Sequence, residues 1–221
     1  MMYKYDLHMH SCEGSMCSDT PIVDMVRYMH SKGFSGAVIT NHFVNGYTRL
    51  FNPLTWDEYC NQYIKGYYNG LQVASELDFD LIFGLEEYIG NSREFLVYGL
   101  DPDFICSHPE LWHASLAQWR EITSSVGAVI VYAHPFRGNN SMPDMSFADG
   151  VELYNSCNSQ EENDKAMETF GKKDLIFTAG GDKHNPPFDY SYGVTFDRRI
   201  RNSAELASAL KEKKHGFYLG Q

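Results

Sequence analysis

Short apolar runs recur along the chain and alternate with segments of helical spacing. The runs predict strands over residues 3–8, 36–40, 80–85, 94–99, 128–133, 149–154, 175–180 and 216–219. Between them, apolar residues at intervals of three and four predict helices over 21–32, 55–77, 108–126, 159–172 and 203–214. The run at 94–99 is expected to pair with 88–90 as a hairpin. This alternation is typical of an α/β protein with a parallel sheet and helices outside it.

Two helix starts carry recognisable signals. Pro21 suits the first turn of the first helix, with Asp19 or Thr20 as its cap. Thr55 followed three residues later by Glu58 is a capping box for the second helix.

Polar side chains that can bind metals follow the apolar runs. His8 and His10 close the first run, and residues two apart in a strand point to the same face. The same kind of side chain follows four further runs, at His42, Glu86, His134 and the pair Asp182 and His184. Buried structural histidines have no reason to be placed so regularly.

Six or seven strand–helix units with polar residues at the strand ends favour a closed or nearly closed barrel. The active sites of such barrels lie at the carboxyl ends of the strands. An open doubly wound sheet is the alternative, but it would not bring five or more strand ends to one point. The length of 221 residues suits a single domain over 1–221.

Histidine, aspartate and glutamate are good ligands for zinc, manganese and iron. Seven candidates are too many for one tetrahedral zinc ion, so two or three divalent ions are expected. Cys12 and Cys17 lie beside the histidine pair, and either is an alternative thiolate ligand.

Composition narrows the partners and the compartment. The net charge of −11 argues against a long basic groove for nucleic acid. No apolar run approaches the roughly 20 residues of a membrane span, and the first residues lack the apolar segment of a signal peptide. Five cysteines without a Cys-x-x-Cys pair indicate free thiols. We therefore expect a cytoplasmic protein without membrane partners.

Five ordered segments resemble the motifs of the PHP (polymerase and histidinol phosphatase) family of metal-dependent phosphoesterases. They are Asp6-Leu7-His8-Met9-His10-Ser11, Ile39-Thr40-Asn41-His42, Gly84-Leu85-Glu86, Ala133-His134-Pro135 and Gly180-Gly181-Asp182-Lys183-His184. The resemblance spans residues 3 to about 185 and implies a distorted (β/α)7 barrel with two or three metal ions.

The resemblance also implies roles for single residues. One ion would be held by His8, His10, Glu86 and Asp182, and Glu86 would bridge to a second ion bound by His134. A third ion would be bound by His42, His184 and Glu13, with Asp19 as the competitor for the place of Glu13.

Two positions depart from the family pattern. Asn41 takes the place of the aspartate in the usual Thr-Asp-His motif. Its side chain can hydrogen-bond but carries no charge. Leu96 lies near a position where the family often has a histidine, so the second ion would be weaker, absent or completed by another group, for which His108 is one candidate. Glu87 would point to the opposite face of the strand from Glu86 and is not expected to be a ligand.

Other residues are candidates for handling the substrate. Arg137 would bind phosphate or form a salt bridge within its loop. Asp182 and His184 could move protons, whereas Lys183 is expected to be structural. The residues expected to orient ligands or line the pocket are Glu152, Asn155, Tyr47 and Arg49.

We therefore expect a phosphoesterase in which a metal-bound hydroxide attacks the phosphorus of a small phosphorylated metabolite or nucleotide. Nucleic acid is a less favoured substrate. Two alternatives stay open: a metal-dependent hydrolase of the amidohydrolase type acting on a non-phosphate substrate, and a PHP-like module without activity.

Overall fold

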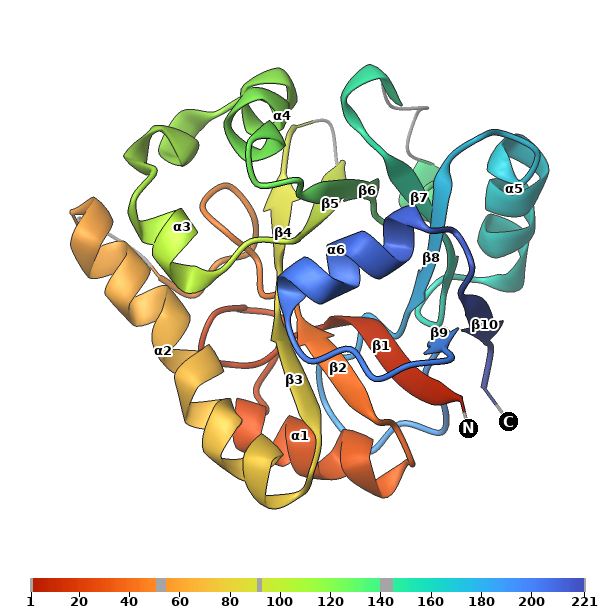
Figure 1. Ribbon diagram of the computed structural model, residues 1–221, viewed down its shortest axis with the longest axis horizontal. Coiled ribbons are helices and arrows are strands. Elements are labelled where there is room, and N and C mark those ends of the chain that lie inside the picture. The colour runs from red at the N-terminus through yellow and green to blue at the C-terminus, as the bar shows by residue number, and fades with distance from the viewer. Residues whose placement is uncertain (1, 51–54, 91–92, 140–144, 221) are drawn as a thin grey trace.

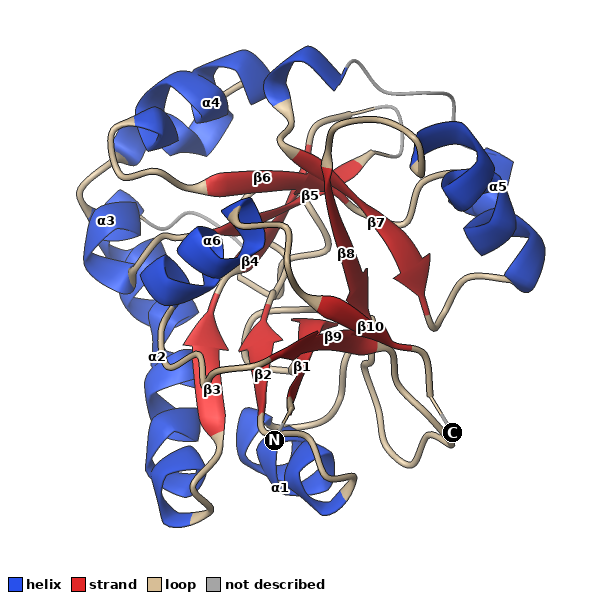
Figure 2. Cartoon of the chain, turned by 45° about the vertical axis from the view of Figure 1, so that its right-hand side comes forward, coloured by secondary structure: helices blue, strands red, loops and turns tan. Residues whose placement is uncertain are grey.

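The computed structural model describes residues 2–50, 55–90, 93–139 and 145–220. Its strands are β1 Tyr3–Met9, β2 Gly36–Ile39, β3 Asp80–Phe83, β4 Leu85–Tyr88, β5 Glu94–Tyr98, β6 Val129–Tyr132, β7 Gly150–Asn155, β8 Ile176–Gly180, β9 Gly193–Phe196 and β10 Gly216–Tyr218. Its α-helices are α1 Ile22–Ser31, α2 Trp56–Glu76, α3 Pro102–Cys106, α4 Leu116–Ser124, α5 Gln160–Phe170 and α6 Ser203–Lys211. The helices lie on the outside and the strands between them (Figure 1, Figure 2).

The predicted (β/α)7 barrel is wrong. The strands form two mixed sheets of five, ordered β10-β9-β1-β2-β3 and β4-β5-β6-β7-β8. Two antiparallel insertions explain the difference: β4 and β5 form a hairpin, and β9 runs antiparallel to both β1 and β10. Within the described residues, isolated bridges join the two sheets at Met9–Lys183 and His42–Glu86. The strand ends therefore still meet at one place, although continuous strand pairing does not join the two sheets into a closed barrel.

Most predicted elements are present, with local corrections. The predicted hairpin is confirmed, with Tyr88 opposite Glu94. Thr55 and Glu58 form the predicted capping box of α2. The predicted helix over 108–126 is wrong in its first part, where a 3-10 turn at Pro109–His113 precedes α4.

Helices cover the sheets through buried apolar faces. Met25 and Val26 of α1 pack with Leu81 of β3. Leu206 and Leu210 of α6 pack against β5. Full burial of each such side chain contributes about 1.5–3 kcal/mol. The part of the chain that the structure describes has no helix with the length and apolar character needed to cross a membrane.

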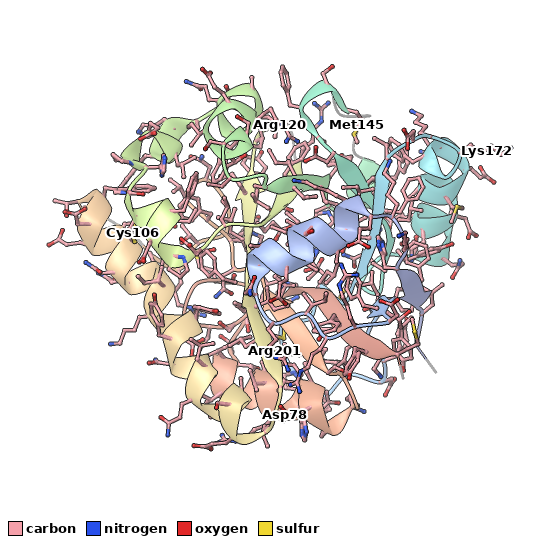
Figure 3. The ribbon with its side chains drawn as sticks, viewed as in Figure 1. Asp78, Cys106, Arg120, Met145, Lys172 and Arg201 are labelled. Carbon is pink, nitrogen blue, oxygen red and sulfur yellow. The ribbon has the colours of Figure 1, made fainter. Side chains whose placement is uncertain are left out.

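Polar contacts fix α4 to the second sheet. Arg120, labelled at the upper edge of Figure 3, donates to the carbonyl oxygen of Phe147 and to the Asp149 carboxylate. Asp149 accepts in turn from the Ile130 N–H of β6 at 2.8 Å. A half-buried ion pair thus joins a helix to the strands that lead to the site.

Candidate metal centre

His8 and His10 project from the end of β1 and are both fully buried. Their Nε2 atoms lie 3.2 Å apart. His8 Nδ1 lies 3.1 Å from Glu152 Oε1, which can only accept, so Nδ1 carries the hydrogen. His10 Nδ1 lies 3.0 Å from Ser15 Oγ, and the Ser15 hydroxyl donates to Asn41. These partners hold both rings with Nε2 toward a common point, as is usual for metal-binding histidines.

Two carboxylates face the same point. Glu86 Oε1 lies 3.3 Å from His8 Nε2, and Glu86 Oε2 lies 3.3 Å from His10 Nε2. Asp182 Oδ1 lies 3.5 Å from His8 Nε2 and 3.2 Å from His10 Nε2. Glu86 is 1% exposed and Asp182 is 2% exposed, so solvent does not screen their charges.

This donor set fits a divalent cation. Imidazole lone pairs and buried carboxylate oxygens repel one another unless a positive charge lies between them. Burial lowers the pKa of His10 to about 3 and keeps that ring neutral. Burial also opposes a charge on His8, but Asp182, Glu86 and Glu152 outweigh it and raise the pKa of His8 well above its ordinary value. A metal ion would therefore replace a proton on His8, as metal binding to histidine does in general.

His42 and His134 extend the centre from the ends of β2 and β6. His134 Nε2 lies 3.0 Å from Glu86 Oε1, and His42 Nδ1 lies 3.2 Å from Glu86 Oε2. His42 Nδ1 is buried and has no hydrogen-bond partner among the described residues. An unpartnered ring nitrogen beside a carboxylate is what a metal ligand shows before the ion is added.

Glu94 is a further carboxylate at this end of the site, and sequence reasoning missed it. Its Oε2 lies 3.4 Å from His134 Nε2, and its Oε1 lies 3.6 Å from His42 Nδ1. Burial, with the neighbouring charge of Glu86, raises the pKa of Glu94 to about 7. The alternation of side chains along a strand could have indicated it, because Glu94 and Leu96 lie on the same face of β5 and a ligand was expected near Leu96.

The structure brings seven of the eight predicted ligands together in groups that share members: His8, His10, His42, Glu86, His134, Asp182 and His184. The eighth, Glu13, lies elsewhere. Both Glu13 oxygens lie 3.1 Å from the Ile22 N–H at the start of α1, where a carboxylate stabilises the helix end. The side chain of Asp19 is 91% exposed and pairs with Arg49. Cys17 lies instead within 4.8 Å of ligand atoms of His10 and His184.

Asn41 organises the loop that follows β1. Its Oδ1 accepts from the Ser11 N–H at 2.7 Å and from the Ser15 hydroxyl at 3.0 Å. Ser15 is the residue that orients His10. The neutral amide therefore supports the ligand shell without adding a charge.

Arg137 is held within the protein and does not extend freely toward a substrate. Its Nη1 donates to Asp182 Oδ2 at 2.6 Å, and its other nitrogens donate to Asn155 and Asn158. The second oxygen of Asp182 is thereby occupied, which turns Oδ1 toward the histidines. Asn155 also donates to Glu152 at 2.9 Å, so Glu152 and Asn155 both orient ligands.

Asp6 fixes β1 to the loop that carries Asp182. Its Oδ1 accepts from the backbone N–H groups of His8 and Gly181 at 2.9 and 2.8 Å, and its Oδ2 accepts from the Ser191 hydroxyl. Burial raises the pKa of Asp6 to about 6. Sequence reasoning quoted Asp6 in the first motif but assigned it no role.

The remaining candidates lie outside the ligand groups. Lys183 Nζ lies over the rings of Phe188 and Tyr190. His108 Nδ1 lies 2.7 Å from the carbonyl oxygen of Phe104, at the end of α3. Glu87 faces the other side of β4, where its carboxylate accepts from the Asn45 N–H.

A cavity of about 490 Å³ opens beside the centre. Its lining includes His134, Glu94 and Arg137 together with Tyr47 and Tyr88. Tyr47, proposed for the pocket wall, is indeed there, whereas the Arg49 guanidinium donates to the carbonyl oxygen of Ser18. A small substrate could therefore reach His134 and Glu94 from solvent.

Solved structures share this fold although sequence comparisons find nothing. No protein-family model and no curated protein match the chain. A two-domain protein from Bacteroides vulgatus, said to contain a predicted PHP-like metal-dependent phosphoesterase, superposes with a TM-score of 0.73 at 15% identity. The match covers 100% of this chain and 65% of that one. The expected resemblance to PHP-like metal-dependent phosphoesterases is confirmed at the level of the fold.

Two further structures match over nearly their whole length. A protein from Bifidobacterium adolescentis, proposed to be a metal-dependent phosphoesterase, gives a TM-score of 0.60 at 13% identity, with 94% of this chain and 95% of that chain covered. An amidohydrolase from Chromobacterium violaceum, solved with sulfate and without metal, gives 0.62 at 14% identity, with 97% of each chain covered.

Proposed function

We propose that the protein is a metal-dependent hydrolase that cleaves a phosphate ester of a small metabolite or nucleotide. The observation that carries the proposal is the convergence of His8 Nε2, His10 Nε2, Glu86 and Asp182 on one buried point beside an open cavity. Two or three ions of zinc, manganese or iron suit this set of nitrogen and oxygen ligands. When bound, the ions would supply a nucleophile at neutral pH and offset charge on the phosphoryl oxygens.

The protein's own side chains would set the geometry for this reaction. Glu152 and Ser15 hold the rings of His8 and His10, and Arg137 holds Asp182. His184 lies at the rim, with its side chain 27% exposed and its Nε2 3.6 Å from Asp182 Oδ1. That position suits His184 either as a ligand of a further ion or as a group that moves a proton to the leaving oxygen.

The amidohydrolase alternative has one observation in its favour, which is the fold shared with the protein from Chromobacterium violaceum. Amidohydrolases commonly place a lysine between two ions. Here Lys183 Nζ lies 3.8 Å from Cys157 Sγ and over the rings of Phe188 and Tyr190. The phosphoesterase therefore stays the better supported proposal.

The test joins metal analysis to two assays on one sample. We expect two or more divalent ions per chain, with turnover of p-nitrophenyl phosphate or bis-p-nitrophenyl phosphate; the preferred ester would distinguish monoester from diester chemistry. Bound metal without turnover of either ester would favour a non-phosphate substrate or an inactive module. A chain that binds no ion after reconstitution with manganese, zinc or iron would overturn the proposal.

Arg137→Lys is expected to lower turnover by about 10- to 100-fold, the usual range for partners of metal ligands. Lysine keeps the charge but cannot reach Asp182, Asn155 and Asn158 at once. If Arg137 positions Asp182, metal affinity falls together with kcat. If it binds substrate phosphate instead, KM rises while metal affinity is unchanged. Arg27→Lys, at an exposed arginine of α1 paired with Asp24, is the matched control.

A further inference from the structure

We propose that Glu94 is a ligand of the second metal ion and replaces the histidine that PHP-like sequences often carry near the position of Leu96. This inference deepens the proposed function and rests on its metal centre. It assigns to this chain a second ion bound by Glu86, Glu94, His42 and His134. Glu94 was not among the residues that the sequence motifs pointed to.

The first support is the arrangement of the two carboxylates around the two rings. Glu86 reaches His134 with Oε1 and His42 with Oε2, at 3.0 and 3.2 Å. Glu94 reaches His134 with Oε2 and His42 with Oε1, at 3.4 and 3.6 Å. Each carboxylate thus has one oxygen beside each of the two ring nitrogens, and Glu86 also reaches His8 and His10 at 3.3 Å, so Glu86 would bridge the two ions.

The second support is the absence of a better partner for these groups. His42 Nδ1 is buried without a hydrogen-bond partner among the described residues. The Glu94 side chain is 17% exposed, and within the part of the chain that the structure describes its carboxylate pairs with the two histidines. Two largely buried carboxylates that share the same neighbours need a cation to offset their repulsion.

The direction of β5 explains why residue 94 can do this, and side-chain chemistry explains why residue 96 cannot. β5 is antiparallel to β6, so its first residue lies beside the carboxyl end of β6, where the Ala133 N–H donates to the Glu94 carbonyl oxygen at 3.0 Å and His134 follows. Leu96 lies directly opposite Glu86, but its side chain is apolar, fully buried in the core and without a ligand atom. Glu94 lies on the same face of β5 as Leu96 and is two residues nearer to the end of β6 that precedes His134.

A carboxylate in place of an imidazole changes the chemistry of the second site. It adds a negative charge and a hard oxygen ligand, and carboxylate-rich sites suit manganese better than imidazole-rich sites do. Glu94 also lines the cavity, so this ion would face an entering substrate. The second site should therefore be more tolerant of manganese relative to zinc than a site with histidine in place of Glu94.

The test measures metal binding rather than turnover. Metal-free full-length protein would be titrated with Mn²⁺ and, separately, with Zn²⁺ by equilibrium dialysis and elemental analysis. We expect Glu94→Gln to weaken the second ion by at least about a hundredfold and to leave the first unchanged. Glu94→His should restore two ions and shift the second site toward Zn²⁺. Glu87→Gln, which alters a neighbouring buried carboxyl on the opposite face of β4, is the matched control.

Retention of both affinities and of the ratio of Mn²⁺ to Zn²⁺ affinity in folded Glu94→Gln would overturn the assignment, whatever the enzyme hydrolyses. A wild-type chain that binds two ions but cleaves no phosphate ester would leave the assignment standing and count against the proposed function alone. A wild-type chain that binds a single ion would overturn the assignment and leave a mononuclear hydrolase.

Discussion

Asp182→Asn is expected to reduce turnover by about a thousandfold or more and to weaken the first metal ion. Asp182 is 2% exposed, and its Oδ1 faces both His8 and His10. Loss of a metal ion forfeits several kcal/mol of transition-state stabilisation, and about 1.4 kcal/mol is a factor of ten in rate. Metal content, affinity and phosphate release would be measured on the same preparation.

Asparagine is the informative substitution because of the backbone at this position. Asp182 has φ 53°, in the left-handed region that asparagine tolerates and alanine does not. Asp182→Asn should therefore keep the fold, which circular dichroism would check. Asp189→Asn, at an exposed residue of the following loop, serves as control. Full turnover in a folded Asp182→Asn protein would remove Asp182 from the centre.

Glu87→Gln is expected to stabilise the metal-free protein increasingly as the pH rises from about 5 to 8. Burial raises the pKa of Glu87 from 4.5 to about 8. The unfolded chain releases this proton near pH 4.5 while the folded chain keeps it, so wild-type stability falls through that range. At about 1.4 kcal/mol per pKa unit, the difference between the two proteins reaches on the order of 4 kcal/mol.

The measurement is thermal or denaturant unfolding of both proteins in chelator at pH 5, 6.5 and 8. A gap of on the order of 10 °C in Tm at pH 8 is expected, since 1 kcal/mol shifts a chain of this size by about 2–4 °C. The gap should nearly close at pH 5. Glu168→Gln, at an exposed position of α5, should show no such trend. A gap independent of pH would mean that Glu87 has an ordinary pKa in the folded protein.

Much of the site was predictable because local patterns carry the information. Strand alternation places His8 and His10 on one face, and the carboxyl ends of neighbouring parallel strands lie at one edge. Those two rules brought His42, His134 and Asp182 into the prediction. The same local rules gave the capping box at Thr55, which depends on residues three apart.

The barrel could not be predicted correctly, because an apolar run does not encode the direction in which a strand pairs. The hairpin of 94–99 with 88–90 was predicted, but the run does not show that its strand also pairs antiparallel with β6. The short connection between β4 and β5 allows a hairpin, and that hairpin interrupts the strand–helix repeat. β9 was missed because Gly193–Phe196 is a short run within a polar segment.

Sequence by itself established which residue types gather at the strand ends and which chemistry they suit. Tertiary structure decided how those residues are used. Glu13 was free to bind either an ion or a helix terminus, and the placement of α1 assigned it to the Ile22 N–H. Arg137 was paired with Asp182, and Glu94 joined the centre through the direction of β5. Each outcome depends on contacts between segments distant in sequence, and no local periodicity encodes such contacts.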